Sequence, residues 1–209
     1  MGMYQMSCTD FANALASEEA VPGGGGAAAM AGAFGVALGS MVANLTVGKE
    51  KYADVQDEII ALKNKAEDLL AAFLLLVQED AENCEPLALA YRLPVDTDEE
   101  RFQKLMMMEE ALVKASETPI DIMKMCGEAI ALHEELAKKG SALAKCDVGV
   151  GVELCLAALR GAAFNVFINT KLMRDRDHAE DLNAQAEKML DEYGKKAEEV
   201  SKLVRESLK

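Results

Sequence analysis

The chain has 209 residues, of which 51% are hydrophobic and 5% aromatic, and it carries a formal net charge of −14. This length favours a single domain, residues 1–209, with one sizeable core. Because nucleic acids and anionic membranes are negatively charged, the acidic balance argues against either as a partner.

Five cysteines occur in the chain, an odd number with no short spacing between any two of them. Disulfide frameworks and zinc sites both need clustered cysteines, so we expect reduced thiols. The histidines, His133 and His178, stand in polar segments without a ligand partner at helical spacing, which predicts surface histidines and no metal site. The start of the chain lacks the basic and apolar regions of a secretory signal, and a cytoplasmic location is expected.

A short helix is expected over 9–17, followed by four consecutive glycines, Gly23–Gly26. No residue from Ala20 to Gly48 is charged, and this run predicts a buried helix that opens on a glycine turn. Small residues recur along one stripe of it at steps of four and three, which favours very close packing against a neighbour: Ala28, Gly32, Gly35, Gly39 and Ala43.

Two other interpretations of this run are less favoured. It is long enough to cross a bilayer, but alanine, glycine and several polar residues dominate it, which favours a core helix. A glycine-rich loop before a helix can also bind phosphate, yet no strand-like segment precedes it and no Gly-Lys-Ser/Thr follows. What remains is that free amides at the helix start can hold an anion.

The rest of the chain also has helical periodicity. A long amphipathic helix is expected after Tyr52, with a kink or restart at Pro86. Thr97 and Glu100 form a capping box that begins the next helix, and Thr118-Pro119 is expected to begin another.

That helix is expected to end at Gly140. A second apolar helix follows over 147–171, and Asp177 is expected to cap a charged final helix. No useful segment alternates with period two, so the prediction is an all-α bundle, with the two least charged helices at its centre.

Polar residues on apolar helices need partners, because an unpaired buried group costs about 1 to 3 kcal/mol. Asn44, Asn165 and Asn169 therefore either tie helices together or bind a ligand. Asp147 stands at a helix start, where a carboxylate also serves as a cap. Asp80 lies near a helix end, where a negative charge is unfavourable, which hints at function, although the composition alone describes a solvated face.

A set of segments that covers nearly the whole chain points to a known family: 22–25 with the following helix and 41–49, Asp80-Ala81, 90–94, Thr118-Pro119, 147–149 and 165–169. Together these segments resemble the cyclodeaminase domain of formiminotransferase-cyclodeaminase and its free-standing bacterial relatives, including methenyltetrahydrofolate cyclohydrolases. One departure is Cys146, where the family often has serine.

The resemblance implies an all-α homodimer with a folate site near the subunit interface and a catalytic aspartate at Asp80. It implies the cyclisation of 5-formiminotetrahydrofolate to 5,10-methenyltetrahydrofolate with loss of ammonia. The cyclohydrolase reaction on the same site remains open, and so does a non-catalytic helical assembly module. The chain is too short to include a transferase domain, so a separate formiminotransferase is a possible partner.

This chemistry needs no metal and no cofactor, since a partly buried carboxylate can act first as base and then as acid. Asp80 is the first choice and Asp147 the second. Side-chain amides suit the pterin edge, and cations or free amides suit the glutamate tail. Lys51 is a further available cation, and the nominated binding residues are Gly23, Gly24, Gly25, Asn44, Lys49, Arg92, Asn165, Asn169 and Lys171.

Overall fold

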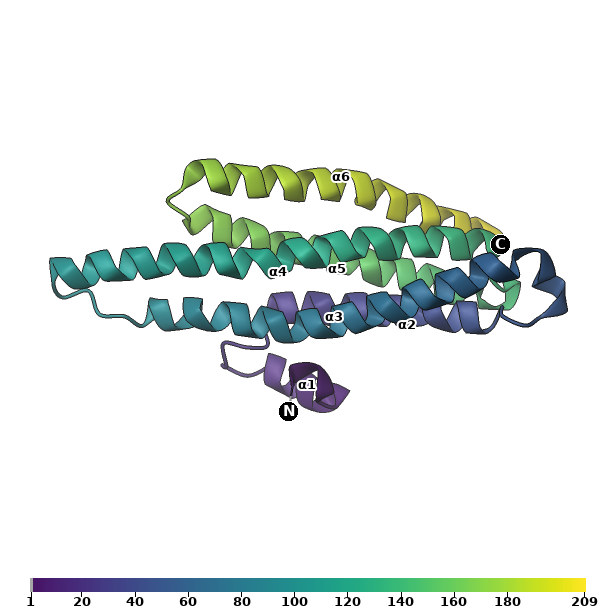
Figure 1. Ribbon diagram of the computed structural model, residues 1–209, viewed down its shortest axis with the longest axis horizontal. Coiled ribbons are helices and arrows are strands. Elements are labelled where there is room, and N and C mark those ends of the chain that lie inside the picture. The colour runs from purple at the N-terminus through teal and green to yellow at the C-terminus, as the bar shows by residue number, and fades with distance from the viewer. Residues whose placement is uncertain (1) are drawn as a thin grey trace.

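A computed structural model describes residues 2–209, and within that range every regular element is a helix (Figure 1). Short 3₁₀ turns precede α1 at Met3–Gln5, join α2 to α3 at Glu50–Val55 and join α4 to α5 at Ala142–Ala144. The predicted all-α class is confirmed. The α-helices are α1 (Cys8–Leu15), α2 (Gly24–Asn44), α3 (Gln56–Tyr91), α4 (Asp98–Lys139), α5 (Lys145–Leu172) and α6 (Arg176–Ser207).

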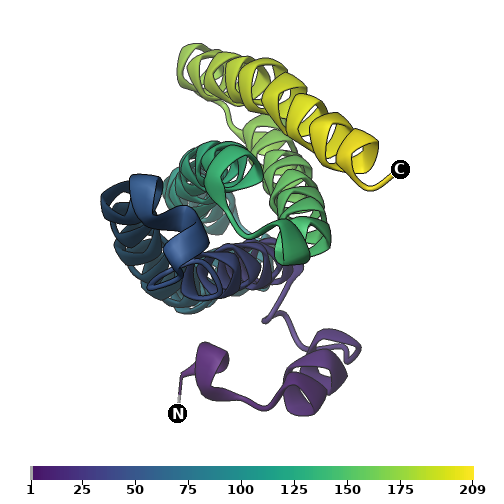
Figure 2. The ribbon, with the colours of Figure 1, turned by 90° about the vertical axis from the view of Figure 1, so that its right-hand side faces the viewer.

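Helices α2 to α5 form the bundle, and α6 covers its outer side against α5 and α4 (Figure 2). The N-terminal segment lies on the opposite side and is tied to α3 where the Met3 N–H donates to Gln78 Oε1 at 2.7 Å. The paired ends of α3 and α4 form a hairpin that extends beyond the start of α2 (Figure 1). Part of this hairpin is therefore left uncovered by α2.

The predicted close packing of α2 is confirmed at its glycines. A Cβ atom built on Gly35 would lie 2.6 Å from Cys155 Sγ and 2.8 Å from the Gly151 carbonyl oxygen, both on α5. A Cβ atom on Gly39 would lie 2.7 Å from Leu132 Cδ2 on α4. The absent side chains let these helix backbones approach each other closely, which explains why α2 tolerates residues that weaken an isolated helix.

The outer face of α2 differs from the expectation of a helix buried on nearly every side. Six apolar residues at steps of four and three form a partly or fully exposed stripe, here called the α2 stripe: Ala27, Ala31, Phe34, Leu38, Met41 and Leu45. The most apolar 18-residue stretch of α2 has a mean hydropathy of 1.6, so α2 is long and apolar enough to cross a membrane. However, 56% of this stretch is buried within the bundle. Helices that form the core of soluble proteins have these same properties.

Two prolines predicted to interrupt helices lie inside them. Pro86 is within α3 and Pro119 is within α4, which runs unbroken from Asp98 to Lys139. A proline leaves the carbonyl four residues earlier without its helical donor. For Pro119 this is the Ala115 carbonyl, and the Asn169 Nδ2 group of α5 donates to it at 3.0 Å. A tertiary contact thus replaces the lost helical bond.

Several helix boundaries agree with the sequence and others shift slightly. The capping box of Thr97 and Glu100 and the stop at Gly140 are confirmed. Ser7, rather than Thr9 or Asp10, caps α1, and Asp175 rather than Asp177 caps α6. These shifts of two or three residues leave the helix order unchanged.

The prediction of two surface histidines is wrong for His133, which is fully buried. Its Nδ1 atom lies 2.8 Å from the Ala129 carbonyl oxygen, and its Nε2 atom has no hydrogen-bond partner among residues 2–209. The ring is placed where Gly39 of α2 and Gly151 of α5 leave space. Burial lowers the pKa of His133 below its ordinary value, despite the carbonyl contact.

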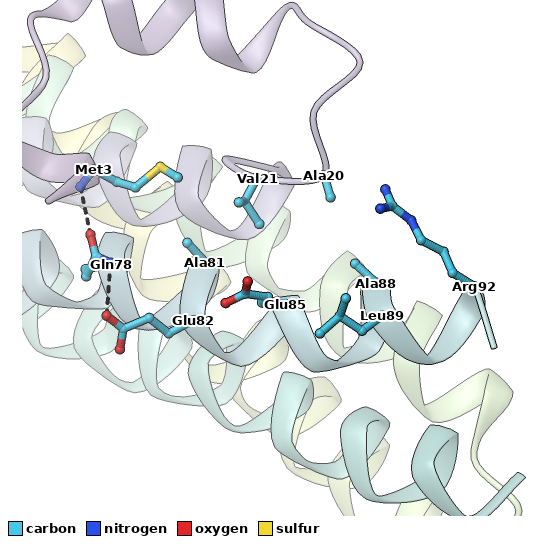
Figure 3. A pocket seen from close by; sticks show the side chains of 10 residues that line it. All are labelled: Met3, Ala20, Val21, Gln78, Ala81, Glu82, Glu85, Ala88, Leu89 and Arg92. Atoms are coloured by element: carbon cyan, nitrogen blue, oxygen red, sulfur yellow. Dashed lines mark hydrogen bonds between the residues drawn. The ribbon is translucent and has the colours of Figure 1, made fainter. Parts of the chain in front are cut away.

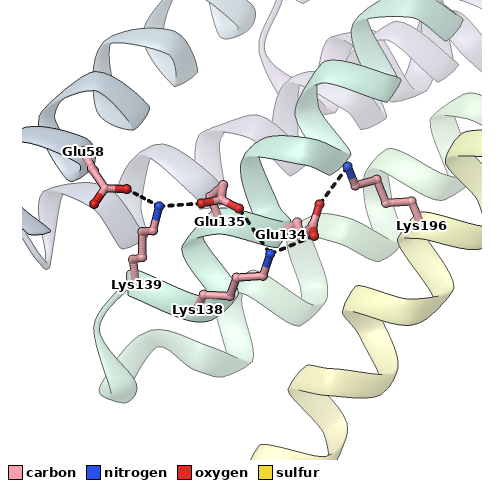
Figure 4. Close-up of polar contacts among 6 residues, drawn as sticks. All are labelled: Glu58, Glu134, Glu135, Lys138, Lys139 and Lys196. Carbon is pink, nitrogen blue, oxygen red and sulfur yellow. Dashed lines mark hydrogen bonds and ion pairs between the residues drawn. The ribbon is translucent and has the colours of Figure 1, made fainter.

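A network of charged side chains links α3, α4 and α6 near the start of α3 and the end of α4 (Figure 4). Lys139 pairs with Glu135 on α4 and with Glu58 on α3, while Glu134 pairs with Lys138 and with Lys196 on α6. These side chains are partly exposed, so each pair contributes little stability by itself.

Candidate active site

The four-glycine segment places the first turn of α2 directly against Asp80 of α3. Gly23 is the N-cap of α2, and Gly24, Gly25 and Gly26 form its first turn. A Cβ atom built on Gly25 would overlap the Asp80 carboxylate. Because glycine has no side chain, the carboxylate approaches the positive end of α2.

Asp80 is buried, with 3% of its surface exposed. Removal from water disfavours the charged carboxylate and raises the pKa of Asp80 to about 6, while the Gly26 N–H that faces it acts in the opposite direction. A carboxyl group with this pKa is largely ionised at pH 7 yet takes up a proton readily. It therefore suits general acid–base catalysis.

Two asparagines from α5 lie on the same side of the bundle. Asn165 Oδ1 would be 3.4 Å from a Cβ atom on Gly24, and its Nδ2 group donates to the Gly161 carbonyl at 2.9 Å. Asn169, one turn further, is buried and fixed by its bond to the Ala115 carbonyl. The structure thus gathers Asp80, the glycine turn and both asparagines at one end of α2.

Three polar residues near Asp80, namely Asn83, Cys84 and Thr118, were not nominated from the sequence. Asn83 Nδ2, on α3, donates to Thr118 Oγ1 on α4 at 2.8 Å. Cys84 lies one turn beyond Asp80, and burial together with the nearby Asp80 charge raises the pKa of its thiol to about 12. Helical spacing of four from Asp80 was the available signal for Cys84, whereas Thr118 required the tertiary structure.

Three nominated residues lie at the opposite end of α2. Asn44 is exposed and donates to the Ser40 carbonyl at 3.0 Å, and Lys49 is exposed just beyond the helix. Asp147 lies in the first turn of α5, half-buried. The 21-residue helix from Gly24 to Asn44 spans about 30 Å. Asn44, Lys49 and Asp147 therefore do not meet Asp80 within one chain.

Arg92 and Lys171, two nominated cations, also lie apart from Asp80. Arg92 lines a cavity of about 310 Å³ between α3 and the N-terminal segment, with Glu82 and Glu85 on its wall (Figure 3). These carboxylates outnumber the single guanidinium, which makes this cavity a poor site for an anionic tail. Lys171 is exposed in the last turn of α5, two residues after Asn169.

Among the residues that the structure describes, no group of three His, Cys, Asp or Glu side chains gathers in a way that could hold a metal ion. The strongest chemical feature is the single buried carboxylate, with helix amides on one side and fixed side-chain amides on another. The fold and site therefore define an all-helical protein equipped for proton transfer to and from a bound ligand.

Comparison with known proteins agrees with this class. The family model described as formiminotransferase-cyclodeaminase matches residues 7–188. A methenyltetrahydrofolate cyclohydrolase from Methylorubrum extorquens is 40% identical over 93% of this chain and 94% of the relative. The crystal structure of a formiminotetrahydrofolate cyclodeaminase from Thermotoga maritima superimposes with a TM-score of 0.81 at 26% identity, covering 98% of this chain and 96% of the other.

The chain belongs to the formiminotransferase-cyclodeaminase family. The chicken formimidoyltransferase-cyclodeaminase is 31% identical over 87% of this chain, but the matched part is only 34% of that longer protein. The chain thus spans about a third of the animal relatives and nearly the full length of the bacterial ones.

Proposed function

We propose that this chain converts tetrahydrofolates at the 5,10-methenyl bridge, with Asp80 as the proton-transferring group. The observation that carries the proposal is the Asp80 carboxylate, buried against the amides of α2 and with its pKa raised to about 6. The family supports a cyclodeaminase that closes 5-formiminotetrahydrofolate to 5,10-methenyltetrahydrofolate and releases ammonia.

In this reaction the N10 amine attacks the protonated formimino carbon. The ionised Asp80 carboxylate removes the proton from N10, which leaves a neutral tetrahedral intermediate. Asp80 then returns that proton to the former imino nitrogen, the carbon–nitrogen bond breaks, and ammonia leaves with the methenyl cation behind. One carboxylate with an intermediate pKa serves both steps, and no metal or cofactor takes part in this proposal.

A cyclohydrolase is the second candidate, favoured by the 40% identity to a cyclohydrolase over nearly the whole of both chains. Here Asp80 takes a proton from the water that adds to the methenyl carbon. The protonated carboxyl group then gives its proton to N5 as the N5–carbon bond opens, and the carbinol oxygen loses its proton to solvent. The product is 10-formyltetrahydrofolate, so the same geometry runs this reaction.

The absorbance of the methenyl chromophore separates these candidates. With 5-formiminotetrahydrofolate, a cyclodeaminase generates the absorbance and releases one ammonia for each molecule converted. With 5,10-methenyltetrahydrofolate, a cyclohydrolase accelerates its loss above the uncatalysed rate. If purified protein does neither, the alternative of a non-catalytic assembly module replaces both enzyme proposals.

The predicted homodimer is also part of this proposal. The α2 stripe is apolar and uncharged over the full length of the helix. Two copies packed antiparallel along this stripe would place the Asn44 end of one α2 beside the Gly24 end of the other. A two-fold arrangement of this kind would bring Asn44, Lys49 and Asp147 to the Asp80 group of the second copy.

Subunit complementation tests this arrangement. Asp80→Asn and Asn44→Ala proteins are each expected to be nearly inactive, whereas mixed dimers contain one site with both native residues. Mixing the two variants after mild dissociation should restore up to about a quarter of the wild-type activity, as random pairing requires. No recovery in dimers shown to have exchanged subunits would contradict a shared site.

A separate formiminotransferase remains a proposed partner for the cyclodeaminase reaction. The animal relatives are formimidoyltransferase-cyclodeaminases about three times longer than the part matched here. A chain that supplies only the second activity would receive its substrate from another protein. Ammonia release in a coupled assay with such a transferase, compared with direct addition of 5-formiminotetrahydrofolate, measures whether the two proteins cooperate.

A further inference from the structure

A second pocket lies where α3 ends and α4 begins, in the part of the α3–α4 hairpin that extends beyond α2. Its volume is about 430 Å³, within the range of small-molecule sites. Tyr91, Met108 and Leu172 supply apolar wall, and Arg101, Lys104 and Arg174 bring positive charge to it. Neither the composition nor the motifs of the sequence pointed to this pocket.

The three positively charged side chains of the pocket differ in whether other protein groups already bind them. Arg101 pairs with Asp98, and the Lys104 ammonium donates to the Tyr91 and Leu93 carbonyls at the end of α3. The Arg174 guanidinium has no hydrogen bond or ion pair to any residue in 2–209. It is therefore the cation available to a ligand.

The single carboxylate in the pocket does not cancel this charge. Both oxygens of Glu109 accept the Arg174 backbone N–H, at 3.0 and 2.8 Å, and one accepts the Asp175 N–H at 2.8 Å. Its charge is thus held by backbone amides. The pocket combines apolar walls with excess positive charge, which matches an aromatic group that carries carboxylates.

One face of α3 leads from Asp80 to this pocket. Asp80, Cys84, Leu87 and Tyr91 follow one another at steps of four, three and four, so they share one face of the helix. Asp80 and Tyr91 are about 16 Å apart along the axis. Exposure rises along this face from buried at Asp80, through half-buried at Cys84 and Leu87, to exposed at Tyr91.

Two other helices approach the pocket in a similar way. Leu172 lies three residues beyond Asn169 on α5, and Met108 lies two turns before Ala115 on α4. A ligand with its reacting end at Asp80 would therefore extend toward the hairpin along a surface formed by all three helices. The acidic cavity at Arg92 lies on a different face of α3, lined by Gln78, Glu82 and Glu85.

We propose that the pocket of Tyr91, Met108, Leu172 and Arg174 holds the p-aminobenzoylglutamate arm of the folate, with the Arg174 guanidinium bound to a glutamate carboxylate. This inference rests on the proposed function, because it takes the substrate to be a tetrahydrofolate. It moves the tail away from the nominated cations Lys49, Arg92 and Lys171.

Kinetics of two arginine variants test the location. Arg174→Gln should raise KM for the folate substrate about tenfold while kcat changes little, because the lost contact is remote from the reacting carbon. Arg92→Gln is the matched control and should behave as wild type. An unchanged KM in Arg174→Gln, or an increase in Arg92→Gln alone, would overturn the proposal.

Direct binding of p-aminobenzoyl-L-glutamate separates this proposal from the proposed function. In protein labelled at its methionine methyl groups, the compound should shift the Met108 resonance, assigned with Met108→Leu, and the shift should weaken in Arg174→Gln. A Met108 shift in protein that turns over neither folate would sustain the pocket and reject the enzyme proposal. Normal turnover without a Met108 shift would reject the pocket and leave the enzyme proposal standing. The same holds if Arg174→Gln changes the oligomeric state and leaves KM unchanged.

Discussion

The Asp80 carboxylate occupies the space that a side chain on Gly25 would need. A Cβ atom built on Gly25 would lie 2.6 Å from the Asp80 carboxyl carbon, closer than non-bonded carbon atoms approach. The glycine segment is therefore required by the position of Asp80 as well as by the turn into α2. This relationship connects the most distinctive sequence feature with the proposed catalytic group.

Gly25→Ala should displace the Asp80 carboxylate and lower kcat by at least about tenfold, since small misplacements of a reacting group are costly. Gly23→Ala is the matched control, because a Cβ atom there would lie 3.7 Å from the Ala20 carbonyl oxygen, an ordinary contact. Steady-state kinetics and circular dichroism of both variants measure the effect. Equal activity in the two variants would contradict the role given to the Gly25 contact.

Asp80→Asn should keep the fold and most of the folate affinity but reduce turnover by about 10²- to 10⁴-fold, the usual loss for an acid–base group. Glu79→Gln and Glu82→Gln are suitable controls because both side chains are exposed. Kinetics at substrate saturation measure the loss of turnover, and calorimetry measures the retained folate affinity. Wild-type turnover in Asp80→Asn would move the proton transfer to another group, with Asp147→Asn the next variant to measure.

The pH dependence of the reaction should reflect the raised pKa of Asp80. Since the base must be ionised, kcat/KM should fall as the pH is lowered through about 6 and level off above it. The same group affects stability, because its pKa is about 6 in the folded chain, above the ordinary value of 3.8 expected in the unfolded chain. The stabilising contribution of protonated Asp80 is full below 3.8 and is lost as the pH rises through 6.

His133 should have the opposite effect on stability. Its pKa is lowered in the folded protein, so the unfolded chain binds a proton first as the pH falls through the ordinary histidine pKa of 6.5. In an Asp80→Asn background, which removes the competing titration, the free energy of unfolding should decrease from pH 7 to pH 5. Urea unfolding at several pH values compares the Asp80→Asn variant with the double variant Asp80→Asn, His133→Leu. The free energy of unfolding should decrease more steeply in the single variant. Parallel decreases would show that His133 does not cause it.

Gly35→Ala should lower the free energy of unfolding by about 1 to 3 kcal/mol, because the new methyl group meets Cys155 Sγ and the Gly151 carbonyl oxygen of α5. Gly194→Ala provides the reverse case, since nothing lies within 4 Å of a Cβ atom there, and alanine should stabilise α6 by up to about 1 kcal/mol. Denaturant unfolding of both variants measures the contrast. A stable Gly35→Ala protein would remove the close-packing explanation.

The sequence predicted the helical class, the glycine-led helix and most helix boundaries, because those depend on local periodicity and capping. It was misleading at Pro119, where a local rule favours a helix start but Asn169 satisfies the freed Ala115 carbonyl from 54 residues away. It was also misleading at His133, whose neighbours in sequence are charged while its neighbours in space are glycines. Such contacts depend on tertiary structure, which a single sequence does not contain.

For the candidate site, the sequence pointed to Asp80, the glycines, Asn165 and Asn169, which the fold gathers together. It could not show that Asn44, Lys49 and Asp147 lie about 30 Å away along the bundle. Helical spacing relates residues within a few turns, whereas the two ends of a 21-residue helix are independent. The free guanidinium of Arg174 was equally hidden, because only the structure shows which cations already have partners.

Helix α2 contacts the rest of the bundle at three heights: its first turn meets Asp80, Gly35 meets α5, and Thr46 just beyond its end accepts the Ser141 N–H at 2.8 Å. These contacts prevent α2 from sliding along its axis, because any shift would drive the Gly35 backbone into Cys155 or Gly151. The packing of the protein interior therefore fixes the position of Asp80, the proposed proton-transferring group, relative to the amides of α2. Substitutions in this packing that do not contact the ligand should therefore displace Asp80 from the amides of α2. Such variants should still fold but have a lower kcat.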